Sequence, residues 1–179
     1  MHRGYTAARY LKRLAAARDA IPDLAVTTDL IVGFPGESDD DFERTLEVVD
    51  TASYDAAYTF VFSPRPGTPA ADMTDHFVPV EVAQERMQRL VDVVERHALV
   101  KHEARVGRIE QVLVEGPSKK DPTVWSGRTR QNKLVHFEPD VGERAGAARE
   151  VRITSAASHW LRGDLVARRV RIPVTAATA

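Results

Sequence analysis

The sequence predicts an α/β fold in two parts: helices alternating with parallel strands, followed by a small antiparallel β-barrel. Three observations support this prediction. The unbroken apolar run Leu30–Val32 is typical of a parallel strand covered on both faces. Helical and strand-like patterns alternate up to about residue 105. After Gly107 the pattern changes to short strands with glycine-bearing turns, which is typical of a closed barrel.

The first predicted strand ends in a glycine loop that leads into a helix. Gly33 and Gly36 tolerate backbone angles that other residues avoid. Asp40 and Glu43 have the spacing of a capping box, so a helix is predicted over residues 39–52. In βα units the loop at the carboxyl end of a strand faces the ligand. Many such loops are only turns, so this geometry alone names no function.

The other elements of the first part surround this unit. An amphipathic helix is predicted over residues 7–20, and an aromatic-rich strand over 56–62 leads into the proline-rich loop 63–69. The loops after two parallel strands should lie at one edge of the sheet. A long helix over 79–105 carries a buried stripe of Ala83, Met87, Leu90, Val94 and Ala98. Two strands do not close a core, so we expect a piece of a larger domain.

The second part is predicted from short strand patterns. They cover residues 109–115, 123–128, 133–137 and 150–154, with one or two more strands within 161–172, and residues 130–132 form a turn. The expected division of the chain is a first domain at 1–78, a linking helix at 79–106, a barrel at 107–173 and a disordered tail at 174–179.

Composition narrows the chemistry. The 179-residue chain has no cysteine, which excludes disulfides, thiol catalysis and cysteine-ligated zinc or iron–sulfur sites within it. His97 and His102, five apart in the long helix, are interpreted as surface histidines rather than metal ligands. No apolar run approaches the roughly 20 residues of a membrane span, and no signal peptide is visible, so we expect a cytoplasmic protein.

Charge is distributed unevenly along the chain. Residues 1–104 hold 11 Lys and Arg against 18 Asp and Glu, whereas residues 105–179 hold 14 against 8. A basic domain beside an acidic one suggests a polyanionic partner for the basic domain. The candidate RNA-binding residues, on two neighbouring turns, are Lys119, Lys120, Arg128, Arg130 and Lys133. Trp125, His136 and Phe137 either stack on bases or pack in the core, and core packing is favoured for Phe137.

Several motifs resemble one family. The string Thr28-Asp-Leu-Ile-Val-Gly-Phe-Pro-Gly-Glu37 resembles the late-barrel motif of radical S-adenosylmethionine enzymes, and residues 1–6 and 62–68 look like landmarks of the tRNA methylthiotransferases. Residues 112–120 and 127–133 resemble that family's TRAM domain, a small RNA-binding β-barrel. The MiaB type is the most similar; it adds a methylthio group to C2 of N6-isopentenyladenosine next to the anticodon.

The resemblance implies a cofactor site at the sheet edge. The general family pattern GxIxGxxE helps to hold the adenosine of S-adenosylmethionine, and Ile31 and Gly33 match it. Asp29 replaces the first glycine, and Glu37 falls one residue late. The implied S-adenosylmethionine site comprises Asp29, Gly33, Glu37, Ser63 and Arg65. The alternatives are that Glu37 stabilises the positive end of the next helix, and that Arg65 hydrogen-bonds loop carbonyls or an RNA phosphate.

The family's radical chemistry needs a CxxxCxxC triad for one 4Fe–4S cluster and three further cysteines for a second, and this chain has neither. We therefore expect the C-terminal part of such an enzyme, with the missing N-terminal half and tRNA as its partners and no catalysis on its own. Three alternatives remain open: a methylthiotransferase for a ribosomal protein, one for threonylcarbamoyladenosine in tRNA, or a stand-alone RNA-binding module.

Overall fold

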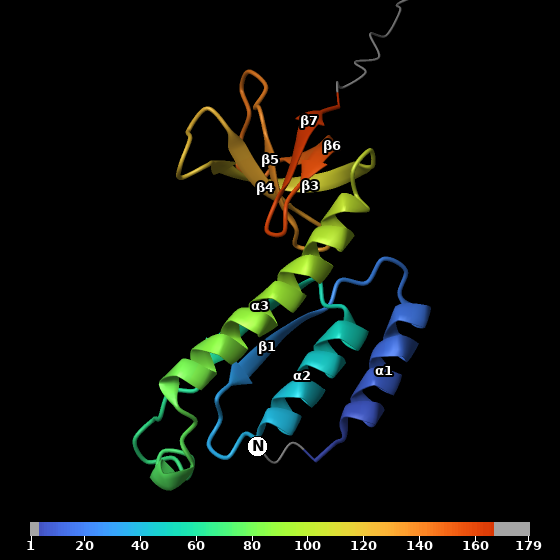
Figure 1. Cartoon of the computed structure of the whole chain (residues 1–179). Coiled ribbons are helices and arrows are strands. Elements are labelled where there is room, and N and C mark those ends of the chain that lie inside the picture. The colour runs from blue at the N-terminus through green and yellow to red at the C-terminus, as the bar shows by residue number, and fades with distance from the viewer. Residues whose placement is uncertain (1–3, 167–179) are drawn as a thin grey trace, which may run out of the picture.

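A computed structural model describes residues 4–166 (Figure 1). The first part contains α1 (Ala7–Ala20), β1 (Thr27–Val32), α2 (Asp39–Ala52), β2 (Ala56–Val61), a short 3₁₀ turn (Thr74–His76) and α3 (Val80–Glu103). The second part contains β3 (Ile109–Pro117), β4 (Trp125–Thr129), β5 (Leu134–Phe137), β6 (Ala148–Ala156) and β7 (Leu161–Leu165). The predicted helices and strands are confirmed to within a few residues. The predicted strand residues 167–172 and the tail 174–179 lie outside the described part.

The first part is a two-stranded parallel sheet with helices on one face. β1 and β2 pair from Thr27↔Ala56 to Val32↔Val61. Apolar residues recur at helical spacing in all three helices and form a stripe on each. These stripes face the sheet, so the three helices contribute to a single core beneath this face. That core contains Leu14, Val32, Phe42, Val49, Ala52, Tyr54, Leu90 and Val94.

The opposite face of this sheet is open. Asp29 and Ile31 of β1 pair with Tyr58 and Phe60 of β2, and all four side chains are exposed. Tyr58 is 73% exposed and Phe60 is 49% exposed. The apolar run Leu30–Val32 is typical of a strand covered on both faces, whereas here one face of β1 is exposed, as expected for a two-stranded piece of a larger domain. Neighbouring side chains of a strand point to opposite faces, and helices cover only one of them.

The first turn of α2 corrects the predicted capping box. The N-cap is Ser38, whose hydroxyl accepts a hydrogen bond from the backbone N–H of Asp41 at 3.2 Å. The Asp41 carboxylate accepts from the Ser38 N–H at 3.1 Å in return. The box is thus formed by Ser38 and Asp41 rather than by Asp40 and Glu43, because the helix begins two residues earlier than that pairing requires.

Helix α3 connects the two parts and also packs against the first. Its 24 residues span about 36 Å at 1.5 Å per residue. Leu90 and Val94 lie in the core of the first part, so α3 is more than a linker. Near its start Arg86 contacts Glu37 after β1, and near its end His102 contacts Ala157 after β6. The glycine loop after β1 and the barrel therefore lie near opposite ends of α3 (Figure 1).

The second part is a closed five-stranded barrel in the order β3-β4-β5-β7-β6. Every neighbouring pair is antiparallel except β5 and β7, which run parallel. The predicted small antiparallel barrel is confirmed apart from the β5–β7 pair, because in a closed ring with an odd number of strands the directions cannot alternate throughout. Its core consists of Val112, Val114, Val135, Phe137, Val151, Ile153 and Leu161.

Two glycines allow neighbouring strands of the barrel to approach closely. A Cβ atom at Gly127 would lie 2.4 Å from the carbonyl oxygen of Leu113, and one at Gly163 would lie 2.4 Å from that of Arg152. Any larger residue would push these backbones apart. Within residues 4–166, none of the helices has the length and apolar character that crossing a membrane requires.

Candidate functional site

The loops after β1 and β2 lie at the same edge of the sheet, as the sequence predicted. The Phe62 N–H donates to the Val32 carbonyl at 2.8 Å, where the two strands end together. The Phe34 and Phe62 rings then meet edge to face, with centroids 5.3 Å apart, and Phe77 adds a third ring at 5.8 Å from Phe62. This aromatic contact ties the two loops together.

Glu37 stabilises the glycine loop from within. Its Oε2 atom accepts from the Gly33 N–H at 2.7 Å and from the Arg86 guanidinium at 2.8 Å. The side chain is only 10% exposed, so this oxygen is already engaged inside the protein. Arg86 also pairs with Asp39 at 2.6 Å. Glu37 therefore shapes the loop from inside the protein.

Arg86 was not predicted as a site residue, although its position in the sequence indicates burial. Arg86 lies three residues after Ala83 and four before Leu90, which places it on the buried stripe of α3. A charged residue on such a stripe needs a partner, because burying an isolated charge is costly. Glu37 and Asp39 are those partners, from the loop that precedes α2 and from its first turn.

The remaining predicted cofactor residues face outward. Asp29 lies on the open face of the sheet, opposite Tyr58. Ser63 and Arg65 are exposed on the loop after β2. Among the described residues no hydrogen bond involves the Arg65 guanidinium, whereas the Arg65 carbonyl accepts from the Thr68 hydroxyl at 2.8 Å. The structure thus leaves these three polar side chains available to a ligand.

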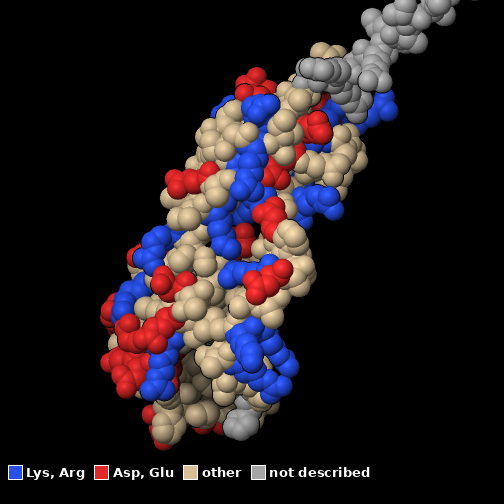
Figure 2. Space-filling view, turned by 90° about the vertical axis from the view of Figure 1, so that its right-hand side faces the viewer, with Lys and Arg blue, Asp and Glu red and all other residues tan. Residues whose placement is uncertain are grey.

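The second candidate site is a groove of about 750 Å³ on the outer surface of the barrel. It runs over β4, β5 and β7 and is bordered by the loop that follows β3. Three of the five predicted RNA-binding residues line it: Lys119, Lys120 and Arg128. It is also lined by His136, Trp160 and Arg162. On the face shown in Figure 2, Lys and Arg side chains form a column over the upper part, which is the barrel end.

The aromatic residues proposed for stacking have different positions. Phe137 is 1% exposed and lies in the barrel core, as favoured, and Trp125 packs against that core. His136 lies in the groove, and its ring meets the Trp160 ring edge to face with centroids 6.2 Å apart. Trp160 is 39% exposed and was missed, because it lies in a turn between strands, where no periodic pattern marks it.

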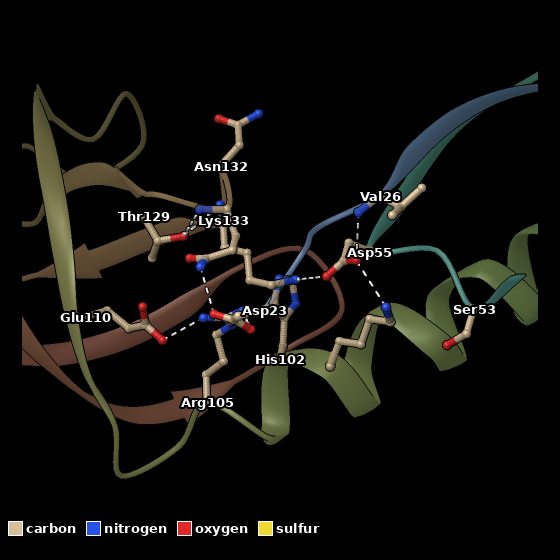
Figure 3. Close-up of polar contacts among 12 residues, drawn as sticks. Asp23, Val26, Ser53, Asp55, His102, Arg105, Glu110, Thr129, Asn132 and Lys133 are labelled. Carbon is tan, nitrogen blue, oxygen red and sulfur yellow. Dashed lines mark hydrogen bonds and ion pairs between the residues drawn. The ribbon is translucent and has the colours of Figure 1, made fainter. Parts of the chain in front are cut away.

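Lys133 is not part of the groove. It is 4% exposed, and its ammonium pairs with Asp55 at 2.9 Å, at the junction of the two parts (Figure 3). Lys133 was predicted to bind RNA together with the other basic residues. Because it is buried and paired with Asp55, it does not belong to that exposed group. Arg130 is exposed but lines a separate hollow with Asp23, away from Lys119.

Asp55 is the centre of this junction. Besides Lys133, it accepts hydrogen bonds from Lys101 at 3.0 Å and from the Val26 N–H at 2.9 Å. Burial alone would raise the pKa of Asp55, but the hydrogen bonds from Lys133, Val26 and Lys101 outweigh it and leave that pKa lowered. Nearby, Arg105 pairs with Asp23 of the first part and Glu110 of the barrel, both at 2.7 Å.

His102 lies in the same junction and is 5% exposed. Its Nδ1 lies 2.7 Å from the Ala157 carbonyl oxygen, and burial, followed by the charge of Lys133, lowers its pKa. The interpretation of His102 as a surface histidine is thus wrong. His97 is partly exposed, with its Nε2 atom 2.8 Å from Asp50.

The residues of this chain do not fit an iron–sulfur cluster. The sequence contains no cysteine, and within residues 4–166 no three His, Asp or Glu side chains are grouped as metal ligands. Thiolates are the usual ligands of such clusters. The sheet edge and the groove are therefore candidate binding sites rather than a redox centre.

Known proteins resemble the chain in both of its parts. Residues 1–49 match the radical SAM superfamily, and residues 103–166 match the TRAM domain. The chain is 48% identical over 96% of its length to the tRNA-2-methylthio-N(6)-dimethylallyladenosine synthase of Geobacillus kaustophilus, and 48% identical over 93% to that of Moorella thermoacetica. It covers 32% and 37% of those proteins, so it spans about a third of the length of the curated relatives it matches. Over almost its whole length the chain is therefore similar to a part of these synthases, and its two matched segments are those of the radical SAM superfamily and the TRAM domain.

Proposed function

We propose that this chain supplies S-adenosylmethionine-binding loops and the RNA-binding domain of a tRNA methylthiotransferase that acts on N6-isopentenyladenosine, also called dimethylallyladenosine. The proposal depends mainly on one observation: the same chain has an open face on the β1–β2 sheet and a basic groove on the barrel. Similarity over more than nine-tenths of the chain to synthases named for this modification supports the choice of substrate. The basic groove favours RNA over a ribosomal protein as the target.

The open face of the sheet fits an adenosyl ligand. Tyr58 and Phe60 present exposed aromatic surface, and Asp29 beside them presents a carboxylate that can accept from ribose hydroxyls. On the neighbouring loop, Arg65 can pair with the methionine carboxylate through its planar fork, next to Ser63. In this family S-adenosylmethionine is the source of the radical. Since the chain lacks ligands for a cluster, its residues would bind and orient the cofactor.

Gly33 and Glu37 would support the ligand site through the shape of the loop rather than by contact with the ligand. The Gly33 N–H is occupied by Glu37, and Glu37 is held by Arg86. Gly33 also has a backbone φ of 70°, and a Cβ atom there would lie 3.0 Å from the Cβ of Ala83. These residues therefore set the path of the loop, and Asp29, Ser63 and Arg65 make the contacts.

The groove residues carry the RNA part of the proposal, and salt dependence tests it. Each phosphate contact releases counterions, so replacing Lys119, Lys120 and Arg128 with alanine should lower the log–log salt slope of tRNA binding by about 2 to 3. The matched control replaces Lys12, Arg13 and Arg44, which are exposed on the first part, and removes the same charge. An equal loss in both variants would show a general charge effect and reject the groove as the RNA site.

A second candidate is RNA binding without catalysis, favoured by the absence of cysteine. Anaerobic reconstitution of this chain with iron and sulfide should leave it colourless and unable to cleave S-adenosylmethionine. A stoichiometric iron–sulfur absorption spectrum would contradict this expectation. Equilibrium dialysis with labelled S-adenosylmethionine separates the candidates, because binding that is lost in Asp29→Ala supports the first and no binding at all supports the second.

A further inference from the structure

The barrel groove is lined by apolar and aromatic side chains as well as by the cations that a phosphate site requires. Phosphate contacts need cations, which Lys119, Lys120, Arg128 and Arg162 provide. Yet the groove is also lined by apolar and aromatic side chains, namely Pro117, Val124, Leu134, His136 and Trp160. Apolar lining adds nothing to the binding of a phosphate. A flat ligand with an apolar face and a charged backbone matches both kinds of lining.

Trp160 is presented to this groove by a constrained turn. It lies in the turn between β6 and β7, where its carbonyl accepts from the Ala157 N–H at 2.9 Å. The backbone of the residue is thereby held, while 39% of its surface remains exposed. A large aromatic ring held at the surface has a face available for stacking.

His136 of β5 lies next to Trp160 and is the middle residue of three that pair across β4, β5 and β7. It pairs with Ser126 of β4 on one side and with Arg162 of β7 on the other. Burial, followed by the charge of Arg162, lowers the pKa of His136, which favours the neutral form of its ring. A neutral ring has no positive charge with which to attract a phosphate. It is suited to contact with the edge or face of a base.

We propose, on the basis of the RNA binding proposed above, that the groove holds one unpaired nucleobase of the RNA. The base stacks on Trp160 and lies against His136, while Arg162 and Lys119 contact the flanking phosphates. A base inside a duplex is already stacked on its neighbours and cannot enter. The barrel thus recognises a bulged, looped or terminal nucleotide rather than the surface of a regular helix.

Substitution of Trp160 tests this proposal in the full chain. Stacking on an aromatic side chain contributes about 1–3 kcal/mol per base, so Trp160→Ala should weaken binding of a short single-stranded RNA about 5- to 150-fold. The salt slope should stay unchanged, because no cation is lost. Trp160→Phe should retain most of the affinity. A fully paired RNA duplex of equal length should bind all three proteins equally.

Fluorescence gives an independent readout. In a Trp125→Phe background Trp160 is the sole indole, and single-stranded RNA should quench its emission whereas the duplex should not. Equal quenching by both RNAs, or unchanged affinity in Trp160→Ala, would overturn the base pocket. If RNA still binds with a steep salt slope in those cases, the proposed RNA-binding function stands without it. If no RNA binds at all, both proposals fail.

Discussion

The two-stranded sheet and the closed barrel solve the same burial problem differently. The barrel encloses its seven core side chains, each at most 1% exposed, because a closed sheet has one inner face and no free edges. The β1–β2 sheet is covered by helices on one face only, and Tyr58 and Phe60 remain exposed on the other. The barrel therefore buries its apolar side chains without help from other elements, whereas the sheet leaves an apolar face available for binding.

Limited proteolysis should reveal the largest difference between the two regions. Local opening is easiest where backbone and apolar surface are exposed. We expect cleavage before about Pro79 to be fast, while the segment from about Gly107 to Val166 survives. Mass spectrometry of the fragments, together with amide hydrogen exchange, measures this. Equal protection of residues 4–75 and the barrel would show that the open sheet is a complete fold.

Paired aromatic substitutions sharpen the comparison. Phe137→Ala removes a ring that is 1% exposed, and it should lower the free energy of unfolding of the barrel by about 3–5 kcal/mol. Phe60→Ala removes a ring that is 49% exposed, and it should change stability by less than about 0.5 kcal/mol. Denaturant titrations followed by circular dichroism give both values. A large loss in Phe60→Ala would mean that the open face is buried in solution.

The junction tests whether the regions depend on each other. Lys133→Ala leaves Asp55 buried with Lys101 as its remaining cation, and removing one partner of a buried pair should destabilise the protein by about 3 kcal/mol. The control Arg130→Ala changes an exposed side chain and should have little effect. The same pair distinguishes roles, because Lys133→Ala should leave the salt slope of RNA binding unchanged. A lower salt slope of RNA binding in Lys133→Ala would show that Lys133 contacts the RNA.

The smallest expected effect is a pH dependence at the junction. The pKa of His102 is lowered in the folded state from its ordinary value of 6.5. As pH falls below 6.5, the unfolded chain gains a proton that the folded chain does not, so stability decreases. Stability should therefore be lower at pH 5.5 than at pH 7.5, and His102→Gln should flatten this change. His76→Gln, at an exposed position, should behave like the unmodified protein. An unaltered pH profile in His102→Gln would exclude this explanation.

Several features that sequence analysis missed follow from periods visible in the sequence. Lys133 lies two residues before Val135 and four before Phe137. Because side chains two apart in a strand point to the same face, this spacing places Lys133 on the inner side of the barrel. His102 continues the stripe of Ala98 at helical spacing, which indicates burial. In both cases the polar character of the side chain suggested an exposed position. The periodic spacing of the apolar residues correctly indicated a buried one.

The sequence by itself determined the helices and strands, the glycine loop, the barrel and the family resemblance, because each depends on residues close together in the chain. Only the tertiary structure decided which partners the buried charges meet. Lys133 meets Asp55 from 78 residues away, and Arg86 meets Glu37 from 49 residues away. Trp160 likewise reaches the groove through the closure of β7 against β5. Such contacts depend on packing between distant elements, which local propensity and spacing do not encode.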